Sequence, residues 1–154
     1  MNHWLFKKEP KNISIDDFVR EGTVGWSGVR NYQARNYMRD TMRIGDLVLI
    51  YHSNSEPSAA MGVGEIVSAP YPDLTAQDPA TSHYDPKATP GNPVWLMLDV
   101  RLSQRFAYPV SLLEIRVSPA LQQMLLIRRG MRLSLQPVSE ADFREVVRMG
   151  TTAR

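Results

Sequence analysis

The sequence predicts a small mixed α+β domain, built most simply around a bent sheet or a partial barrel. Short apolar segments with the alternation or continuous hydrophobicity of strands are spread over the whole chain. Signals for short helices lie between these segments, not in a separate half. The 154 residues fit one domain, residues 1–154, with a substantial core and neither an internal repeat nor a linker.

The N-terminal part of the chain contains one strand signal and one helix signal. Residues 3–7 (HWLFK) alternate in polarity, which predicts a strand. Ser14 and Asp17 have the spacing of a capping box, so we expect a short helix over residues 14–21, ended by Gly22.

The next third predicts one helix and two strands. A glycine-rich turn at 25–28 should lead into a helix from about residue 31 to 42. Residues 47–52 (LVLIYH) form a continuous apolar run, which is typical of a strand buried on both faces. Residues 62–69 are expected to form the following strand, with small residues that allow a bend.

A long irregular segment separates this part from the C-terminal third. Residues 70–94 are rich in proline and contain two Asp-Pro steps, so we expect a loop that serves as a functional flap. Residues 95–106 alternate cleanly and predict a long strand.

The remaining residues predict short elements. Short helices are expected after Ser111 and Ser118, a strand at 132–136, and a last helix from Ser139 to about Met149.

Composition narrows the class of protein. With 43% hydrophobic and 22% charged residues, the chain resembles an ordinary globular protein, and the absence of cysteine excludes disulfides and thiolate chemistry. The N-terminus lacks the pattern of a signal peptide, and the longest apolar run, residues 47–51, is too short to cross a bilayer. We therefore expect an intracellular, cytoplasmic protein with no membrane partner.

The charge pattern alone is weak evidence for a nucleic-acid partner. The net charge is only +2, although the pI is about 9.0. Of the 18 lysine and arginine residues, 14 are arginine, which suits bidentate contacts with phosphate. High genomic GC content also favours arginine, so the bias is open to both interpretations.

Residues 25–40 (GWSGVRNYQARNYMRD) contain an unusual number of aromatic, amide and guanidinium side chains. Trp26 offers an aromatic face between glycines, and Asn31 and Gln33 offer paired donors and acceptors. These are the parts of a site for a planar, hydrogen-bonding ligand. The alternative is that Trp26 simply fills the core.

Three arginines of the same segment recur at a spacing of four residues. Arg35, Arg39 and Arg43 should therefore form one stripe of the predicted helix. One interpretation is a set of phosphate contacts. The other is a solvated face on which the arginines pair with nearby acids.

Known catalytic and cofactor motifs are missing. His3, His52 and His83 show neither the HExxH spacing nor an i,i+4 pair, and no GxSxG, GxGxxG or Walker sequence occurs. The sequence predicts no metal and no cofactor.

Several longer motifs carry a family resemblance. These are WLFKKEP, WSGVRNYQARN, IGDLVLIYHS, APYPD, HYDPK, NPVWLMLDV and RLSLQPVS, in this order from about His3 to Val147. They resemble the EVE domain family of the PUA-like superfamily, which is similar in fold to YTH domains. The resemblance implies a mixed β pseudobarrel flanked by short helices. It also implies a non-catalytic reader of modified bases, with modified cytosine as the best candidate, in DNA or RNA.

The resemblance also implies a binding pocket, with Trp26 as its stacking wall. The residues expected to bind the ligand are Lys7, Lys8, Glu9, Trp26, Gly28, Val29, Arg30, Asn31, Tyr51, His52, Ser53, Tyr84 and Ser134. Ser134 is a weaker candidate for the pocket floor, together with Gln136, and Asp85 could close the pocket with Tyr84 from the long loop. Arg35 and Arg39 are the expected phosphate contacts. Lys8 departs from the family, which usually has serine there.

Two other functions fit the same residues. The first is an enzyme acting on nucleic acid or nucleotides, with Glu9, His52 or Asp85 as acid or base. The second is a small adaptor that binds a peptide or metabolite.

Overall fold

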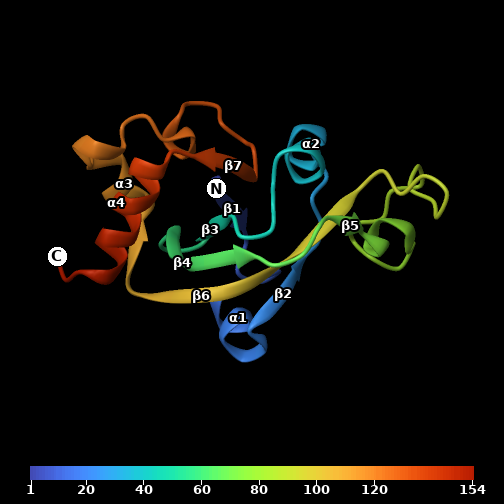
Figure 1. Cartoon of the computed structure of the whole chain (residues 1–154), viewed down its shortest axis with the longest axis horizontal. Coiled ribbons are helices and arrows are strands. Elements are labelled where there is room, and N and C mark those ends of the chain that lie inside the picture. The colour runs from blue at the N-terminus through green and yellow to red at the C-terminus, as the bar shows by residue number, and fades with distance from the viewer.

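The computed structural model describes residues 1–154 and consists of one mixed sheet flanked by short helices (Figure 1). The strands are β1 (His3–Lys8), β2 (Thr23–Trp26), β3 (Leu47–His52), β4 (Ala59–Ile66), β5 (Tyr71–Pro72), β6 (Leu96–Ser111) and β7 (Leu135–Val138). The α-helices are α1 (Ile15–Glu21), α2 (Tyr32–Asp40), α3 (Leu112–Val117) and α4 (Glu140–Thr151). The 3-10 turns are η1 (Leu74–Gln77), η2 (Pro119–Leu121) and η3 (Leu125–Ile127).

The seven strands form a strongly curved sheet. Its order is β2-β6-β4-β3-β1-β7, with β5 paired to β6, and only the β1–β3 pair is parallel. Bulges interrupt the pairing of β4 with both neighbours. At Gly62 the chains approach so closely that a Cβ atom would lie 2.4 Å from the carbonyl oxygen of Gln104. The curvature brings the two edge strands to one core, where Trp26 of β2 and Leu135 of β7 belong to the same cluster. This confirms the predicted α+β class with a barrel-like sheet.

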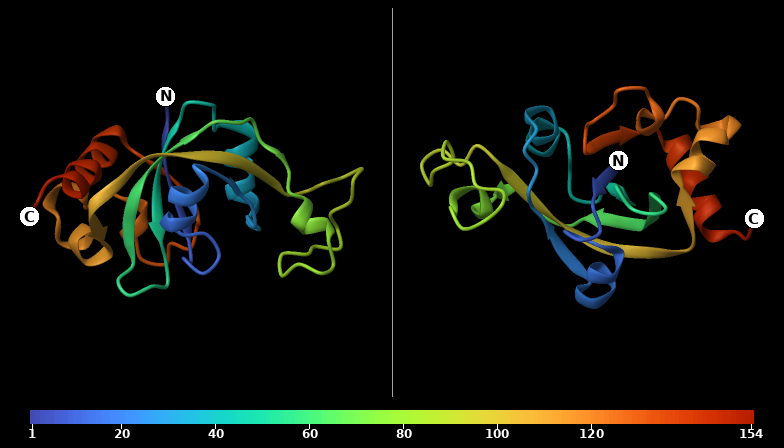
Figure 2. Two further views of the ribbon diagram at one scale, coloured as in Figure 1. Left: turned by 90° about the horizontal axis from the view of Figure 1, so that it is seen from below. Right: turned by 180° about the vertical axis from the view of Figure 1, so that it is seen from behind.

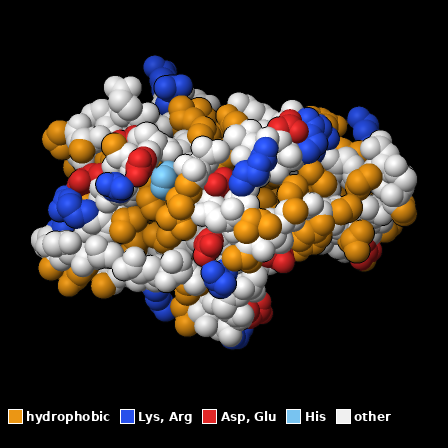
Figure 3. Space-filling view, viewed as in Figure 1, with side chains coloured by type: hydrophobic (Ala, Val, Ile, Leu, Met, Phe, Trp, Pro, Cys, Tyr) orange, Lys and Arg blue, Asp and Glu red, His pale blue; other side chains and the backbone are white.

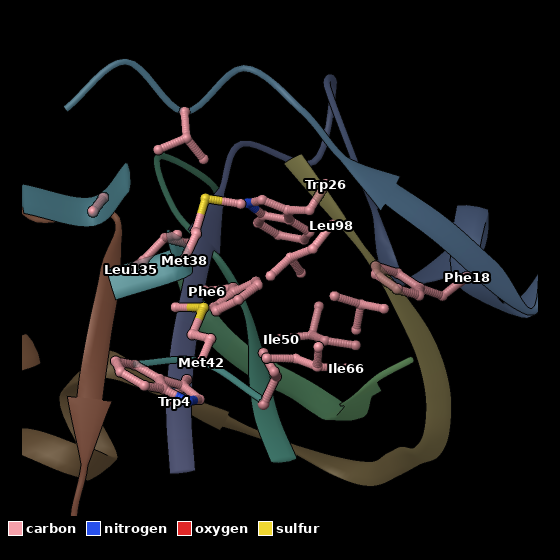
Figure 4. Close-up of a cluster of buried hydrophobic side chains, with 14 of the residues drawn as sticks. Trp4, Phe6, Phe18, Trp26, Met38, Met42, Ile50, Ile66, Leu98 and Leu135 are labelled. Atoms are coloured by element: carbon pink, nitrogen blue, oxygen red, sulfur yellow. The ribbon is translucent and has the colours of Figure 1, made fainter. Parts of the chain in front are cut away.

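β3 separates two hydrophobic cores. Val48 and Ile50 join the cluster inside the curve, which is shown in Figure 4. Leu49 and Tyr51 join the cluster on the opposite face, which α4 covers with Phe143. Since both faces of β3 are buried, its continuous apolar sequence is explained, as predicted.

The helix boundaries agree closely with the capping signals. Ser14 and Asp17 form both bonds of a capping box, and the N–H of Gly22 ends α1 by donating to the carbonyl of Phe18. Asn31 caps α2 and Ser139 caps α4, each by accepting a backbone N–H.

Several segments differ from the sequence prediction. The strand expected at 62–69 is β4, Ala59–Ile66, and the strand expected at 95–106 continues to Ser111 as β6. Trp26, expected in a turn, ends a strand because β2 pairs with β6. The last strand begins at Leu135, not at residue 132, and the side chain of Gln136 donates to the carbonyl of Leu133 just before it. Residues 70–94 are not wholly irregular, because Asp73 caps the 3-10 turn η1.

Residues 73–95, which we call the flap, project from one end of the sheet, while α3 and α4 cover the other end (Figures 1 and 2). The flap has a small core of its own, formed by Ala76, Ala88 and Trp95. No helix of the structure combines the length and the apolar character needed to cross a membrane.

Candidate nucleic-acid interface

A polar cleft of about 430 Å³ lies where β1, the β2–α2 connection and the flap meet. It brings together several of the residues that the sequence predicted for the site: Lys7, Lys8, Glu9, Gly28, Val29, Ser53 and Ser134. It adds four residues that the sequence analysis did not place there: Lys11, Asn12, Ser82 and His83.

The parallel pairing of β1 and β3 explains why these residues meet. Parallel strands end at the same edge of a sheet, and Lys8 is paired with His52. Ser53 continues the pairing, with its N–H donating to the Lys8 carbonyl at 3.0 Å. On the other side, the N–H of Lys7 donates to the carbonyl of Ser134 at 2.8 Å. The cleft is therefore built from the polar residues at and beyond three strand ends.

Lys8 turns from the cleft toward the protein interior. Its Nζ donates to the carbonyl oxygen of Ser27 at 2.6 Å and lies 5.3 Å from the centre of the Trp26 ring. Burial lowers the pKa of Lys8 to about 8, while the negative charge of Asp73 opposes this shift and the positive charge of Arg30 adds to it.

Trp26 lies behind Lys8 and is only 1% exposed. Its ring packs against Phe6 at a centroid distance of 5.2 Å and lies near Met38 and Leu98 (Figure 4). The indole therefore belongs to the core in this structure, and the Lys8 ammonium lies over its ring.

Arg30 attaches the flap to the body of the domain. Its guanidinium donates to the carbonyl oxygen of His83 through Nε and Nη2, to Thr75 Oγ1, and to Asp73 Oδ2 at 3.1 Å. Asp73 is fully buried. Burial alone would raise its pKa, but hydrogen bonds from Thr75, the Gly28 N–H and Arg30 outweigh this effect and lower it.

The imidazole of His83 lies directly against the backbone of Gly28. A Cβ atom at position 28 would be 3.0 Å from Nε2 of His83, and the φ angle of +84° also favours glycine. Burial and the charges of Lys8 and Arg30 lower the pKa of His83. Near pH 7 the cleft therefore presents a neutral, planar ring at its wall.

Other residues of the 25–40 segment bind the flap. Tyr32 stacks on Trp95 at 4.7 Å, Arg35 lies over the Tyr32 ring, and Arg35 Nη1 donates to the carbonyl of Val94 at 3.0 Å. Attachment of the flap thus explains in large part why this segment contains so many aromatic and guanidinium side chains.

The remaining predicted site residues lie outside the cleft. Tyr51 is buried in the core on the opposite face of β3, and Asn31 caps α2. His52 accepts a hydrogen bond from the N–H of Ile15 through Nε2 at 3.0 Å, and burial lowers its pKa. Tyr84 lies on the flap and is 42% exposed.

Arg39 is exposed on α2 and is paired with Asp40. It lines a separate apolar pocket of about 430 Å³, together with Met42 and Leu98.

A second groove of about 460 Å³ continues from the cleft. It shares Lys7 and Ser53 with the cleft and extends to Arg132 on the loop before β7. Its other lining residues are Asn54, Gly130 and Met131. The run of arginines at 128–132 was the available sequence signal for this groove.

The site has little of the character of a metal centre. No group of three or more His, Asp or Glu side chains is placed so that it could hold a metal ion. Figure 3 shows lysine and arginine side chains spread over one face among apolar residues, without a single large basic field.

Comparisons with known proteins agree on one family. The EVE domain family matches residues 2–149. Human thymocyte nuclear protein 1 is 35% identical over 161 residues, a match that covers 92% of this chain and 71% of that protein. The chicken protein of the same name is 37% identical, with 92% and 65% covered.

Solved structures show the same relationship. A hypothetical protein from Leishmania major has a TM-score of 0.92 and 41% identity, with 97% of this chain and 94% of that chain covered. Human THYN1 in complex with DNA containing 5-methylcytosine has a TM-score of 0.89 and 34% identity, with both chains fully covered (100%). The YTH domain of Zygosaccharomyces rouxii MRB1 (TM-score 0.57, 13% identity) shares the fold alone. From its sequence and its structure, this chain belongs to the EVE domain family.

Proposed function

We propose that this protein is a non-catalytic module that binds nucleic acid containing a modified base in its polar cleft. The observation that carries the proposal is the similarity to human THYN1, which was solved with DNA containing 5-methylcytosine and matches this chain over its full length. The function implied by the sequence motifs is therefore the first one to test.

The cleft has the chemistry needed to hold a base. Its volume of about 430 Å³ falls in the range of about 300–1,000 Å³ typical of small-molecule sites. Hydroxyls of Ser53 and Ser134 and the amide of Asn12 can read a hydrogen-bonding edge, and the neutral ring of His83 offers a flat contact. Lys7 and Lys11 place positive charge at the same walls.

The second groove supplies a path for the sugar-phosphate backbone. Lys7 belongs to both cavities, and Arg132 continues the positive charge beyond the cleft. A strand with one base in the cleft could therefore place its neighbouring phosphates near these two cations. Arg35 and Arg39 stay candidates for phosphate contact, although Arg35 already donates to Val94 and Arg39 is paired with Asp40.

We further propose modified cytosine as the preferred base and an aromatic group as part of the pocket. The methyl group contributes only about 0.8 kcal/mol by burial. Stacking on an aromatic ring is stronger, at about 1–3 kcal/mol per base. Discrimination for the modified base should therefore be modest, and phosphate contacts should supply much of the affinity.

Existing bonds of the three acid–base candidates favour a reader over an enzyme. Glu9 accepts from Asn54 at 2.8 Å and pairs with Lys11, and His52 accepts from Ile15. Asp85 accepts from the indole N–H of Trp95 at 2.7 Å. Each group is thus already bonded to a protein partner.

The test is a binding screen with short DNA and RNA strands that differ only at one central cytosine, unmodified or 5-methylated. We expect tighter binding of the methylated strand, by a factor of up to about four, and unchanged nucleosides after incubation. Equal, weak binding of every strand would refute the proposal, and a converted nucleoside would indicate an enzyme. A peptide or metabolite that displaces the strand competitively would favour the adaptor.

We also propose an intracellular site of action, where nucleic acids are present. The name of the human relative, a nuclear protein, is consistent with this.

A further inference from the structure

We propose that Lys8 controls access to an aromatic contact of the site: its side chain closes the passage from the polar cleft to the ring of Trp26. The inference deepens the proposed function and rests on it, because it concerns how a base could reach the indole. The closure itself is a property of the free protein and can be tested without nucleic acid.

The position of Lys8 between the two environments is the first observation. Lys8 lines the cleft, yet its Nζ reaches across to the carbonyl of Ser27 at 2.6 Å. On that path the ammonium lies over the Trp26 ring, 5.3 Å from its centre. With Lys8 in this position, Trp26 is 1% exposed and the cleft does not include it.

The other neighbours of Trp26 could not move as easily. Phe6 and Phe18 contact the ring from within the core, and Leu98 is its partner across the β2–β6 pair. Displacing any of them would disturb the sheet or α1. The lysine side chain is a flexible four-carbon stem with one hydrogen bond to Ser27, so it can swing into the cleft without backbone movement.

Charges of both signs surround Nζ in its present position, where burial lowers the pKa of Lys8. Asp73 attracts the ammonium and Arg30 repels it, and His83 faces it from the flap. Asp73 is already bonded by Arg30, Gly28 and Thr75, which leaves the Ser27 carbonyl as the partner of Lys8.

The closure has a consequence for binding. A hydrogen bond from a charged donor and the stacking of one base are similar in strength. A base that reaches Trp26 must break the hydrogen bond of Lys8 before it can stack on the indole. The net gain in binding free energy from stacking is therefore small in the wild-type protein. We expect the wild type to bind chiefly through polar contacts, and a protein without the Lys8 cover to bind through stacking.

The first experiment measures access to Trp26 by acrylamide quenching of tryptophan fluorescence. Trp4 and Trp95 are also buried, so the wild-type background should be low. Lys8→Ser and Lys8→Ala remove the cover and should raise the quenching constant about twofold or more. Lys8→Met keeps the bulk without the charge and should stay near the wild type. The matched control is Lys11→Ser, which removes an exposed cation from the same cleft without uncovering the ring.

An unchanged quenching constant in Lys8→Ser and Lys8→Ala proteins that retain a cooperative thermal transition would overturn the proposal. The two variants serve as replicates, so that misfolding of one leaves the other decisive.

The second experiment uses a short single strand with one central 5-methylcytosine. Lys8→Ser should bind about tenfold more tightly than the wild type, with quenching of tryptophan fluorescence, whereas Lys11→Ser should bind more weakly. If Lys8→Ser loses affinity as Lys11→Ser does, Lys8 is an ordinary cationic contact and the proposal is wrong. If no variant binds the strand but acrylamide reaches Trp26 in Lys8→Ser, the closure is confirmed and the proposed nucleic-acid function fails.

Discussion

Arg30 donates twice to the main-chain carbonyl oxygen of His83, through Nε at 2.9 Å and through Nη2 at 2.8 Å. The two residues are 53 positions apart in the chain. Through this contact a residue just before α2 holds the part of the flap that forms one wall of the cleft. The shape of the cleft therefore depends on a side chain that does not line it.

Replacing Arg30 should loosen the flap. In Arg30→Gln the buried carboxylate of Asp73 loses its cation, which should cost about 3–5 kcal/mol of unfolding free energy. Amide hydrogen exchange of residues 73–95 should accelerate, and affinity for a methylated strand should fall about tenfold. Arg101→Gln, which breaks an exposed pair with Glu65, is the control and should change little. Unaltered exchange in the flap would contradict the role given to Arg30.

Trp26→Ala should destabilise the whole domain, because it leaves a cavity beside Phe6 and Leu98. Large-to-small changes of buried aromatic residues cost about 3–5 kcal/mol, which urea unfolding can measure. Trp26→Phe should cost less. A loss below about 1 kcal/mol in Trp26→Ala would show that the indole is not a packing element of this core.

Salt dependence should identify the cations that contact phosphate. If Lys7 and Arg132 bind the backbone, Lys7→Gln with Arg132→Gln should weaken methylated and unmodified strands equally. The slope of log affinity against log salt should become flatter by about 0.7 for each lost contact on single strands. The pair Arg35→Gln with Arg39→Gln tests the alternative on α2 in the same way. Arg144→Gln, on exposed α4 surface, is the control. Slopes equal to the wild type in either double mutant would remove that pair from the interface.

Stability should rise in alkaline solution because of Lys8. Its pKa is about 8 in the folded protein, against 10.5 for an unperturbed lysine, so between these values the unfolded chain binds more protons. The unfolding free energy of the wild type should therefore increase from pH 8 to pH 10.5 relative to that of Lys8→Met. Below pH 8 the titration of Lys8 should make no contribution to the pH dependence of stability. Parallel stability curves of the two proteins across this range would contradict the lowered pKa of Lys8.

His52 should make the protein less stable in mild acid. Burial lowers its pKa below 6.5, and its Nε2 must stay unprotonated to accept the Ile15 N–H. As the pH falls through 6.5, the unfolded chain takes up the proton first, so stability is lost on acidification. His52→Gln keeps a hydrogen-bond acceptor at a similar distance but has no titrating ring. The unfolding free energies of the wild type and of His52→Gln should therefore run parallel above about pH 7.5 and diverge toward about pH 5. A constant difference over that range would exclude His52 as the source.

The sequence by itself determined the elements whose signals are local. The capping box joins Ser14 to Asp17, which lies only three residues later in the chain. The apolar run 47–52 indicates a single strand that is buried on both faces. The resemblance to the EVE domain family implied the polar residues at the end of β1 as part of the site, and these residues do line the cleft. Local hydrogen bonds and side-chain periodicity depend on near neighbours, which the linear sequence contains.

The tertiary structure alone decided which contacts the aromatic and guanidinium groups of residues 25–40 make. Trp26 lies behind Lys8, and Arg30 reaches Asp73 and His83 over 43 and 53 positions of the chain. Arg132 joins the site only because β7 pairs with β1. The contact of Lys8 with Trp26 requires the sheet to curve, because β1 and β2 are not neighbours in the strand order. That curvature is a property of all the strands together, and no short stretch of sequence encodes it.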